Sequence, residues 1–433
     1  MARYIVEPGA AVAGRLRVPG DKSISHRALM FGALAAGTTR VTGFLEGEDC
    51  LSTLKAVASL GVTVERPVPG EVRVEGVGLR GLRDPGGVLD MGNAGTAMRL
   101  FMGLLAAQPF DSELVGDSSL MRRPMERVAK PLRSMGAVIE TQDGRPPVRI
   151  RGGATLSGIH YDMPVASAQV KSAVMLAGMY AEGETTVVEP AITRDHTERM
   201  MQTFGVEVVA RGGKVTVRPP GRLEAADIAV PGDFSSAAFF IVAACIGARE
   251  PMVIEGVGVN PTRTGLLEML ALMGADLRLV NHRTAGAEPV ADIEIRPAQL
   301  RGARIPERLV PLAIDEFPAL FVAAACAEGE TLVTGAEELR VKESDRIAVM
   351  ARGLDAVGVR NEVLPDGLRI EGGPIGGGVV DSHGDHRIAM SFAVAGLRAS
   401  APIEILDVAN VATSFPGFAD LARGAGIRLR EAD

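Results

Sequence analysis

The stretch SISHRALMFGALAAG, residues 23–37, sets the pattern by which the rest of the chain can be read. A short polar cluster opens it, and an Ala-rich apolar run of roughly three helical turns follows. Because the run is apolar on nearly every side, it predicts a buried helix rather than a helix on the surface.

The same pattern returns five more times along the chain. Each apolar run is followed by a short β-rich stretch, a polar loop, a second and more amphipathic helix that ends near a glycine, and one or two further strands. Such regular spacing indicates a repeat, so we expect an α/β protein of six helix-strand-helix-strand units. The six starts, separated by 70, 74, 68, 80 and 70 residues, are Ser23, Asn93, Ser167, Ser235, Asp315 and Asp385.

The composition narrows the class of protein. The chain has 433 residues, of which 47% are hydrophobic and 23% charged, which is typical of a soluble globular protein of two or three domains. A net charge of −7 without a basic stretch disfavours a nucleic-acid partner. If anions bind, the positive charge must be gathered locally, so individual Arg and Lys positions are informative.

Several other classes of site are not expected. The three cysteines lie far apart without a CxxC pair, which argues against a zinc site or a disulfide framework. No uncharged stretch is long enough to span a membrane, and the first residues show no signal or transit pattern. We therefore expect a cytoplasmic protein with no membrane partner.

The polar residues at the helix starts exceed what capping needs. Ser, Asn and Asp are preferred N-caps, but a cap supplies only one oxygen. The starts also carry Lys22 and Arg27, Gln169, His386 and Arg387, and helix N-termini favour anions. Arg27 falls inside an otherwise buried helix, where a charge without a partner would be costly. These clusters predict anion binding.

PGDKSISHR, residues 19–27, closely resembles the N-terminal signature of the 5-enolpyruvylshikimate-3-phosphate synthase family. The six-unit pattern likewise resembles the two-lobed inverted α/β barrel of the enolpyruvyl transferases, with three units per lobe. This resemblance implies that residues 21–231 form the N-terminal lobe, and that residues 1–20 and 232–433 form the C-terminal lobe. It also implies a hinge at the crossings, closure around the ligands and a monomer.

The resemblance assigns substrate contacts in the first two units. Lys22 would touch both substrates, shikimate 3-phosphate and phosphoenolpyruvate, while Ser23 and Arg27 would hold shikimate 3-phosphate. In GNAGTAMR, Gly95 would let backbone N–H groups reach phosphoenolpyruvate. In GDSSLMRRPMERV, Arg123 would clamp the same anion, the alternative being an exposed loop arginine.

The third unit adds further implied contacts. In ASAQVKSA, the residues Ser167, Ala168 and Gln169 match a shikimate 3-phosphate site, with Gln169 also beside phosphoenolpyruvate. Arg194 in ITRDHTER matches an arginine that some bacterial members use for the phosphate of shikimate 3-phosphate.

In the C-terminal lobe, IDEFPALF resembles the segment that carries the catalytic aspartate, here Asp315, and ELRVKESDR supplies Lys342, Glu343 and Arg346. Asp315 and Lys342 would contact shikimate 3-phosphate, whereas Arg346 and Arg387 would contact phosphoenolpyruvate. The charged run could also be a salt-bridged helix face. Its place before the second helix of the fifth unit, where units two and three carry arginine loops, favours the site.

The implied reaction moves the enolpyruvyl group of phosphoenolpyruvate to the 5-hydroxyl of shikimate 3-phosphate, in chorismate and aromatic amino acid biosynthesis. Addition and elimination through a tetrahedral intermediate need a base, an acid and fixed cations. We assign Asp315 as the hydroxyl base, Glu343 to proton transfer at C3 and Lys22 as a supporting acid, although the division among the three stays open. No motif calls for a metal or an organic cofactor.

One departure bears on inhibition by glyphosate. Many members have a lysine before the Phe-Pro of the last unit, where this chain has Thr413. Together with Arg194 and ASAQ, this resembles a divergent bacterial subgroup whose members often tolerate glyphosate. Tolerant members carry alanine in the glycine loop, whereas this chain has Gly95, so we expect glyphosate to inhibit.

Three rival functions can be compared with this reaction. The sister enzyme that uses UDP-N-acetylglucosamine usually has asparagine after the lysine and a reactive cysteine before the RP motif, where this chain has Ser23 and then Ser118 and Ser119. A non-catalytic binding protein on the same scaffold should have lost one of the charged groups assigned to catalysis, yet all are present. An RNA-end-modifying enzyme of related architecture is disfavoured by the acidic composition.

Overall fold

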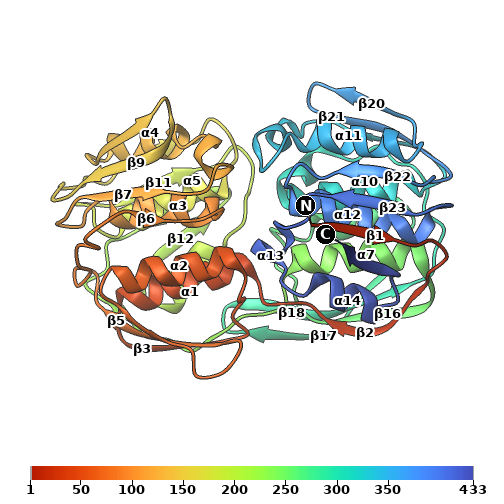
Figure 1. Ribbon diagram of the computed structural model, residues 1–433. Coiled ribbons are helices and arrows are strands. Elements are labelled where there is room, and N and C mark those ends of the chain that lie inside the picture. The colour runs from red at the N-terminus through yellow and green to blue at the C-terminus, as the bar shows by residue number, and fades with distance from the viewer. Residues whose placement is uncertain (1, 433) are drawn as a thin grey trace. The chain divides into compact units, whose positions relative to one another are not determined.

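The computed structural model describes residues 2–432, which form two compact units (Figure 1). The N-terminal unit comprises Gly20–Val230 together with the short segment Ala285–Glu288. The C-terminal unit comprises the chain up to Pro19, Pro231–Thr284 and the chain from Pro289 onward. The short segment was expected in the C-terminal lobe with its neighbours, but its contacts place it in the N-terminal unit.

In the N-terminal unit, each repeat begins with a helix that is buried over almost its whole length, as the apolar runs predict. These buried helices are α1 (Lys22–Leu34), α3 (Gly95–Leu105) and α5 (Ala168–Gly178). The second helix of each repeat keeps an exposed face. These helices are α2 (Glu48–Ser59), α4 (Glu126–Ser134) and α6 (His196–Thr203).

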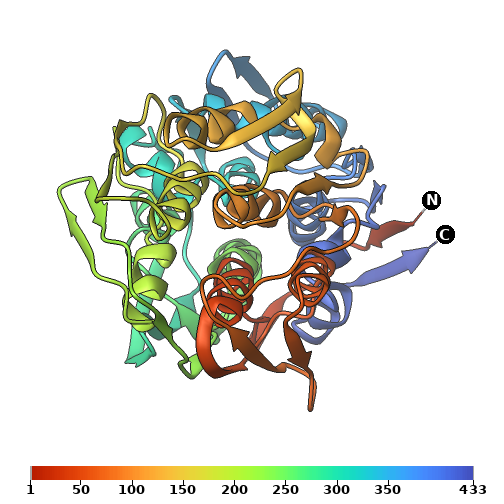
Figure 2. The same ribbon diagram turned by 90° about the vertical axis from the view of Figure 1, so that its left-hand side faces the viewer.

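Three sheets complete this unit, which Figure 2 shows from its own side. Their strand orders are β14-β3-β5-β4 with β15 on β3, β6-β7-β9-β8 and β10-β11-β13-β12. In each sheet, the strand that follows the buried helix has one antiparallel and one parallel side. The antiparallel pairs are β3 with β5, β7 with β9 and β11 with β13. The parallel pairs are β3 with β14 and β15, β7 with β6 and β11 with β10. The strands are β3 (Ala35–Thr42), β4 (Thr63–Glu65), β5 (Glu71–Val77), β6 (Leu89–Asp90), β7 (Ser112–Val115), β8 (Val138–Gln142), β9 (Arg145–Arg151), β10 (His160–Asp162), β11 (Thr185–Val188), β12 (Val208–Arg211), β13 (Lys214–Val217), β14 (Leu223–Glu224) and β15 (Ile228–Ala229).

The C-terminal unit repeats this plan. Its buried helices are α7 (Phe234–Gly247), α10 (Phe317–Ala325) and α12 (His386–Ala395). The second helices are α8 (Gly265–Leu272), α11 (Arg346–Ala356) and α14 (Phe418–Gly424), and two short helices are α9 (Val310–Ala313) and α13 (Val411–Ser414).

The first residues of the chain complete two sheets of the C-terminal unit. Strand β1 (Arg3–Val6) pairs antiparallel with both β23 and β24, and β2 (Val12–Arg17) pairs parallel with β16. The red strand β1 accordingly lies beside the blue β23 in Figure 1. The other strands are β16 (Ala248–Gly258), β17 (Asp276–Ala285), β18 (Glu288–Arg296), β19 (Gly329–Val333), β20 (Asn361–Leu364), β21 (Gly367–Gly372), β22 (Gly378–Asp381), β23 (Ile403–Leu406) and β24 (Leu429–Ala432).

Each unit has its own hydrophobic core, packed mainly from Ala, Val, Leu, Ile, Met and Phe side chains. Four expected helix starts are corrected, because the N-caps are Asp21, Ala94, Asp233 and Glu316 in place of Ser23, Asn93, Ser235 and Asp315. Helix α1 begins at Lys22, because Asp21 is its N-cap and accepts a hydrogen bond from the backbone N–H of Ile24 at 2.9 Å. Helix α10 begins at Phe317, so Asp315 lies in the turn before the helix and does not cap it.

None of the helices within residues 2–432 has the length and apolar character required to cross a membrane.

Candidate active site

Arg27 on α1 is buried, with 4% of its surface exposed, and its hydrogen bonds within residues 2–432 are to neutral oxygens. Its Nε donates to Thr197 Oγ1 at 2.7 Å, its Nη2 donates to Ser172 Oγ at 3.0 Å, and its Nη1 donates to the carbonyl oxygen of Ser23 at 2.9 Å. Burial lowers the pKa of Arg27 to about 10, so the side chain is still charged at neutral pH. A desolvated cation held by neutral groups is suited to bind an anion.

Lys22 and Ser23 occupy the first turn of the same helix, and both are partly exposed. Lys22 Nζ forms an ion pair with Asp49 Oδ2 at 2.9 Å. Asp49 itself is buried and lies on α2, the second helix of the first repeat. Helix α2 therefore orients the ammonium group of Lys22, which lies on α1.

Gly95 and Arg123 meet at the start of α3. A Cβ added at Gly95 would lie 3.0 Å from Arg123 Nη1 and 3.1 Å from Arg99 Nη1, so a side chain there would press on both guanidinium groups. Arg123 is buried, and its Nη2 donates to Asn93 Oδ1 at 2.7 Å. Arg123 is therefore not an exposed loop arginine, which was the alternative interpretation.

Gln169 links the starts of α3 and α5. Its Oε1 accepts from Arg99 Nη1 at 2.9 Å, and its Nε2 donates to Thr96 Oγ1 at 2.9 Å. Next to it, Ser167 caps α5 and Ala168 is its first residue. These contacts bring Ser167, Ala168 and Gln169 of the third repeat beside the glycine loop of the second.

Arg194 lies in the loop between β11 and α6 and is partly buried. The positive charge of Arg194 contributes to the lowered pKa of Arg27, although burial is the larger cause. Arg27 and Arg194, two of the four cations assigned to shikimate 3-phosphate, are thus within electrostatic reach of each other.

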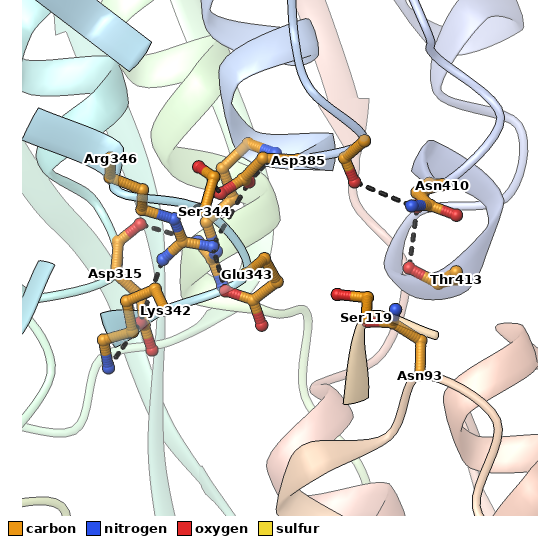
Figure 3. A network of polar contacts seen from close by, with 12 residues as sticks. Asn93, Ser119, Asp315, Lys342, Glu343, Ser344, Arg346, Asp385, Asn410 and Thr413 are labelled. Atoms are coloured by element: carbon orange, nitrogen blue, oxygen red, sulfur yellow. Dashed lines mark hydrogen bonds and ion pairs between the residues drawn. The ribbon is translucent and has the colours of Figure 1, made fainter. Parts of the chain in front are cut away.

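In the C-terminal unit, three carboxylates surround the buried guanidinium of Arg346 (Figure 3). Its Nε donates to Asp385 Oδ2 at 2.9 Å, its Nη2 donates to Glu343 Oε2 at 2.6 Å, and its Nη1 lies 3.5 Å from Asp315 Oδ1. Burial by itself would lower the pKa of Arg346, but the charges of the three carboxylates outweigh it and raise the pKa.

Two further cations approach Asp315. Lys342 Nζ lies 3.4 Å from its Oδ1, and Arg387 Nη1 donates to its carbonyl oxygen at 2.9 Å. Arg387 also lies 3.8 Å from Glu316 Oε1. The structure therefore gathers Asp315, Lys342, Glu343, Arg346 and Arg387, which come from three separate stretches of the sequence.

Sequence reasoning missed several groups that support these residues. Asp385 was treated only as a helix start, yet it both caps α12 and binds Arg346. Arg99 is the last residue of GNAGTAMR. An arginine one helical turn after Gly95 was a usable signal that a second guanidinium, besides that of Arg123, lies beside the glycine loop. Thr197, a lone hydroxyl on an outer helix, gave no signal, since its contact with Arg27 joins residues 170 positions apart.

Within residues 2–432, the structure contains no group of three or more His, Cys, Asp or Glu side chains placed to hold a metal ion. The chemically useful groups are guanidinium, ammonium and carboxylate groups. Guanidinium and ammonium groups bind phosphate and carboxylate, and carboxylates can take up and return protons.

The α/β fold gathers buried guanidinium groups that are suited to bind small, multiply charged anions. The sequence model of EPSP synthase (3-phosphoshikimate 1-carboxyvinyltransferase) matches residues 6–421. The chain belongs to the EPSP synthase family, as the sequence motifs predicted.

Individual relatives agree over the full length. A 3-phosphoshikimate 1-carboxyvinyltransferase of Alkalilimnicola ehrlichii is 62% identical over 432 residues, which cover 99% of this chain and 97% of the relative. One from Methylococcus capsulatus is 59% identical over 427 residues, or 98% of each chain. The solved EPSP synthase of Acinetobacter baumannii superposes with a TM-score of 0.90 at 56% identity, with 100% of both chains covered. The predicted α/β fold class is confirmed.

Proposed function

We propose that this chain transfers the 1-carboxyvinyl group of phosphoenolpyruvate to the 5-hydroxyl of shikimate 3-phosphate and releases phosphate. Membership of the EPSP synthase family supports this reaction. The structural observation that carries it is the pair of carboxylates, Asp315 and Glu343, on one buried guanidinium, that of Arg346. Addition followed by elimination needs two such proton-transferring groups beside a fixed cation.

In the addition step, the hydroxyl oxygen bonds to C2 of phosphoenolpyruvate and its proton passes to Asp315. C3 gains a proton at the same time, and Glu343, with Lys22 in support, supplies it. In the elimination step, the bond between C2 and the phosphate oxygen breaks, Asp315 passes its proton to the departing phosphate, and C3 returns a proton to Glu343, which restores the double bond and both starting carboxyl groups. Cations fixed around the intermediate stabilise its charge without reorganisation.

Shikimate 3-phosphate binds through residues in two repeats of the N-terminal unit and through two residues of the C-terminal unit. Arg27 supports this assignment best, because its guanidinium is desolvated and its contacts are neutral. The assigned residues are Lys22, Ser23, Arg27, Ser167, Ala168, Gln169, Arg194, Asp315 and Lys342.

Phosphoenolpyruvate binds beside Gly95, where the absence of a side chain leaves room next to Arg123. Arg387 is well suited to its carboxylate, since a guanidinium has five N–H donors and the contacts given above use only Nη1. The assigned residues are Lys22, Gly95, Arg123, Gln169, Arg346 and Arg387.

The test is phosphate release from phosphoenolpyruvate with either shikimate 3-phosphate or UDP-N-acetylglucosamine as the acceptor. We expect release with shikimate 3-phosphate alone, and a loss of roughly 100-fold or more in Asp315→Asn, because general-base catalysis is worth at least that factor. Asp276→Asn is the matched control in this unit, since Asp276 is on β17 and its ion pair among the described residues is with the exposed Arg278. Release with the nucleotide sugar would contradict the proposal.

We also propose that the enzyme acts as a monomer in the cytoplasm. A mass near 45.3 kDa by light scattering, with and without substrates, would support the monomer, and a doubled mass would contradict it. Activity that copurifies with a membrane or periplasmic fraction would contradict the location.

A further inference from the structure

A buried ion cluster lies next to Arg27 in the N-terminal unit. Lys171 on α5 is 1% exposed, and its Nζ lies 2.6 Å from Glu198 Oε1 and 3.0 Å from Glu189 Oε2. The carboxylates of Glu189 and Glu198 are also buried. Burying three charges is costly, and none of the three belongs to the site described above, so the cluster needs an explanation.

The cluster holds two segments that bear on substrate binding. Glu198 lies in the first turn of α6, directly after Thr197. Glu189 accepts hydrogen bonds from the N–H and the hydroxyl of Thr193, and Lys171 Nζ donates to the carbonyl oxygen of Thr193 at 3.4 Å. Lys171 thus fixes both the start of α6 and the loop that leads into Arg194.

A second link between α5 and α6 runs parallel to the first. Thr197 immediately precedes Glu198 in the chain, Ser172 immediately follows Lys171, and Thr197 Oγ1 donates to Ser172 Oγ at 2.7 Å. Thr197 Oγ1 also accepts from Arg27 Nε, and Ser172 Oγ accepts from Arg27 Nη2. Both hydroxyl groups are fully buried, so their positions determine where the guanidinium of Arg27 lies.

We propose that Thr197 and Lys171 are positioning residues for shikimate 3-phosphate. Thr197 orients the guanidinium of Arg27, and Lys171 holds the turn that carries Thr197 and the loop that carries Arg194. Neither residue touches the substrate. When ionised, Glu198 opposes the lowering of the Arg27 pKa that burial causes, whereas burial raises the pKa of Glu198 itself. The inference rests on the proposed function, because it assigns Arg27 and Arg194 to this substrate.

The first test compares Thr197→Val with Thr197→Ser. Valine keeps the shape of threonine but removes the hydroxyl, whereas serine keeps the hydroxyl. We expect Thr197→Val to weaken binding of shikimate 3-phosphate alone, measured by calorimetry, by about tenfold, as loss of a hydrogen bond to a charged group does. The kcat and the KM for phosphoenolpyruvate at saturating shikimate 3-phosphate should change less than about threefold, and Thr197→Ser should restore binding.

Thr186→Val is the matched control, because Thr186 on β11 forms a hydroxyl pair of 2.9 Å with Thr216 and contacts neither Arg27 nor Lys171. Wild-type binding by Thr197→Val, or an equal loss in Thr186→Val, would overturn the role of Thr197. So would failure of Thr197→Ser to restore binding.

The second test changes the ion cluster. Lys171→Met should weaken shikimate 3-phosphate binding by more than tenfold. If Lys171→Met does not fold, Glu198→Gln takes its place, because it leaves the balanced pair of Lys171 and Glu189 in the core. For Glu198→Gln we expect shikimate 3-phosphate binding to weaken several-fold, again without a matching loss of kcat. Wild-type binding in the folded variant overturns the role of Lys171. Failure of the wild-type protein to bind shikimate 3-phosphate would instead overturn the proposed function.

Discussion

Arg27 and Arg346 are both buried arginines, yet the atoms around them differ in charge. Arg27 donates to two hydroxyls and a carbonyl oxygen, whereas Arg346 contacts three carboxylates. The positive charge of Arg27 is therefore available to a ligand, at a cost in folding free energy. The charge of Arg346 is balanced within the protein, and removing Arg346 would leave its carboxylates without a cation.

Replacing each of these arginines by methionine should therefore have opposite effects on stability. Arg27→Met should leave the melting temperature unchanged or raised, because Thr197 and Ser172 remain hydrogen-bonded to each other. It should weaken shikimate 3-phosphate binding by roughly 100-fold, as loss of a charged partner does. Arg346→Met should lower the free energy of unfolding by about 3 kcal/mol or more. Calorimetric melting and binding measure both, and a large destabilisation by Arg27→Met would contradict this account.

Gly95 governs the space beside the guanidinium groups of Arg123 and Arg99. The chain as it stands should be inhibited by glyphosate in competition with phosphoenolpyruvate. In Gly95→Ala, the new methyl group lies about 3 Å from both guanidinium groups, whose flexible ends can shift, so folding should survive. We expect the KM for phosphoenolpyruvate to rise several-fold and the inhibition constant of glyphosate to rise further. A wild-type inhibition constant far above the KM would contradict this prediction.

Among the elements, α3 and α5 lie close to each other at Gly103. A Cβ built there would lie 2.1 Å from the carbonyl oxygen of Ala173, so a side chain must push the two helices apart. Gly103→Ala should lower the free energy of unfolding by roughly 1–3 kcal/mol. It should also weaken binding of both substrates, because α3 carries Gly95 and α5 carries Gln169. Gly221→Ala is the control in urea denaturation, since its Cβ meets open space, and equal midpoints in the two variants would count against this close approach.

The elements were largely predictable from the sequence, because their signals are local. Six apolar runs at regular spacing located all six buried helices, and the motifs located the arginines and carboxylates around Arg346. Four helix starts were off by one or two residues, and in two of them an aspartate just before the expected cap took its place, namely Asp21 and Asp233. The partners of Arg27 were not predictable, since Thr197 and Ser172 reach it from other repeats, and only the fold brings them together.

At the scale of the whole molecule, charge is distributed unevenly. The chain carries a net charge of −7, yet its assigned ligand-binding cations number four in the N-terminal unit and three in the C-terminal unit. Many acidic side chains outside the site are instead paired with exposed arginines, as Glu255 is with Arg15 and Arg17. The two substrates together bring about five to six negative charges. They meet a repulsive net charge at long range and attractive cations at short range.

Salt screens both the long-range repulsion by the net charge and the short-range attraction by the site cations. The distance over which each acts decides which of the two changes more when salt is added. Raising KCl from about 50 mM to about 500 mM shortens the screening length from about 14 Å to about 4 Å. The diffuse net charge is already weakened at the lower salt, whereas the site cations act over a few ångströms, and added chloride also competes for them. We therefore expect the KM of each substrate to rise several-fold while kcat changes less than about twofold. Tetramethylammonium chloride at equal ionic strength should give the same rise, since the effect belongs to screening and to chloride. A KM that falls with salt would mean that the net charge of the whole chain, rather than the seven cations, controls access of the substrates.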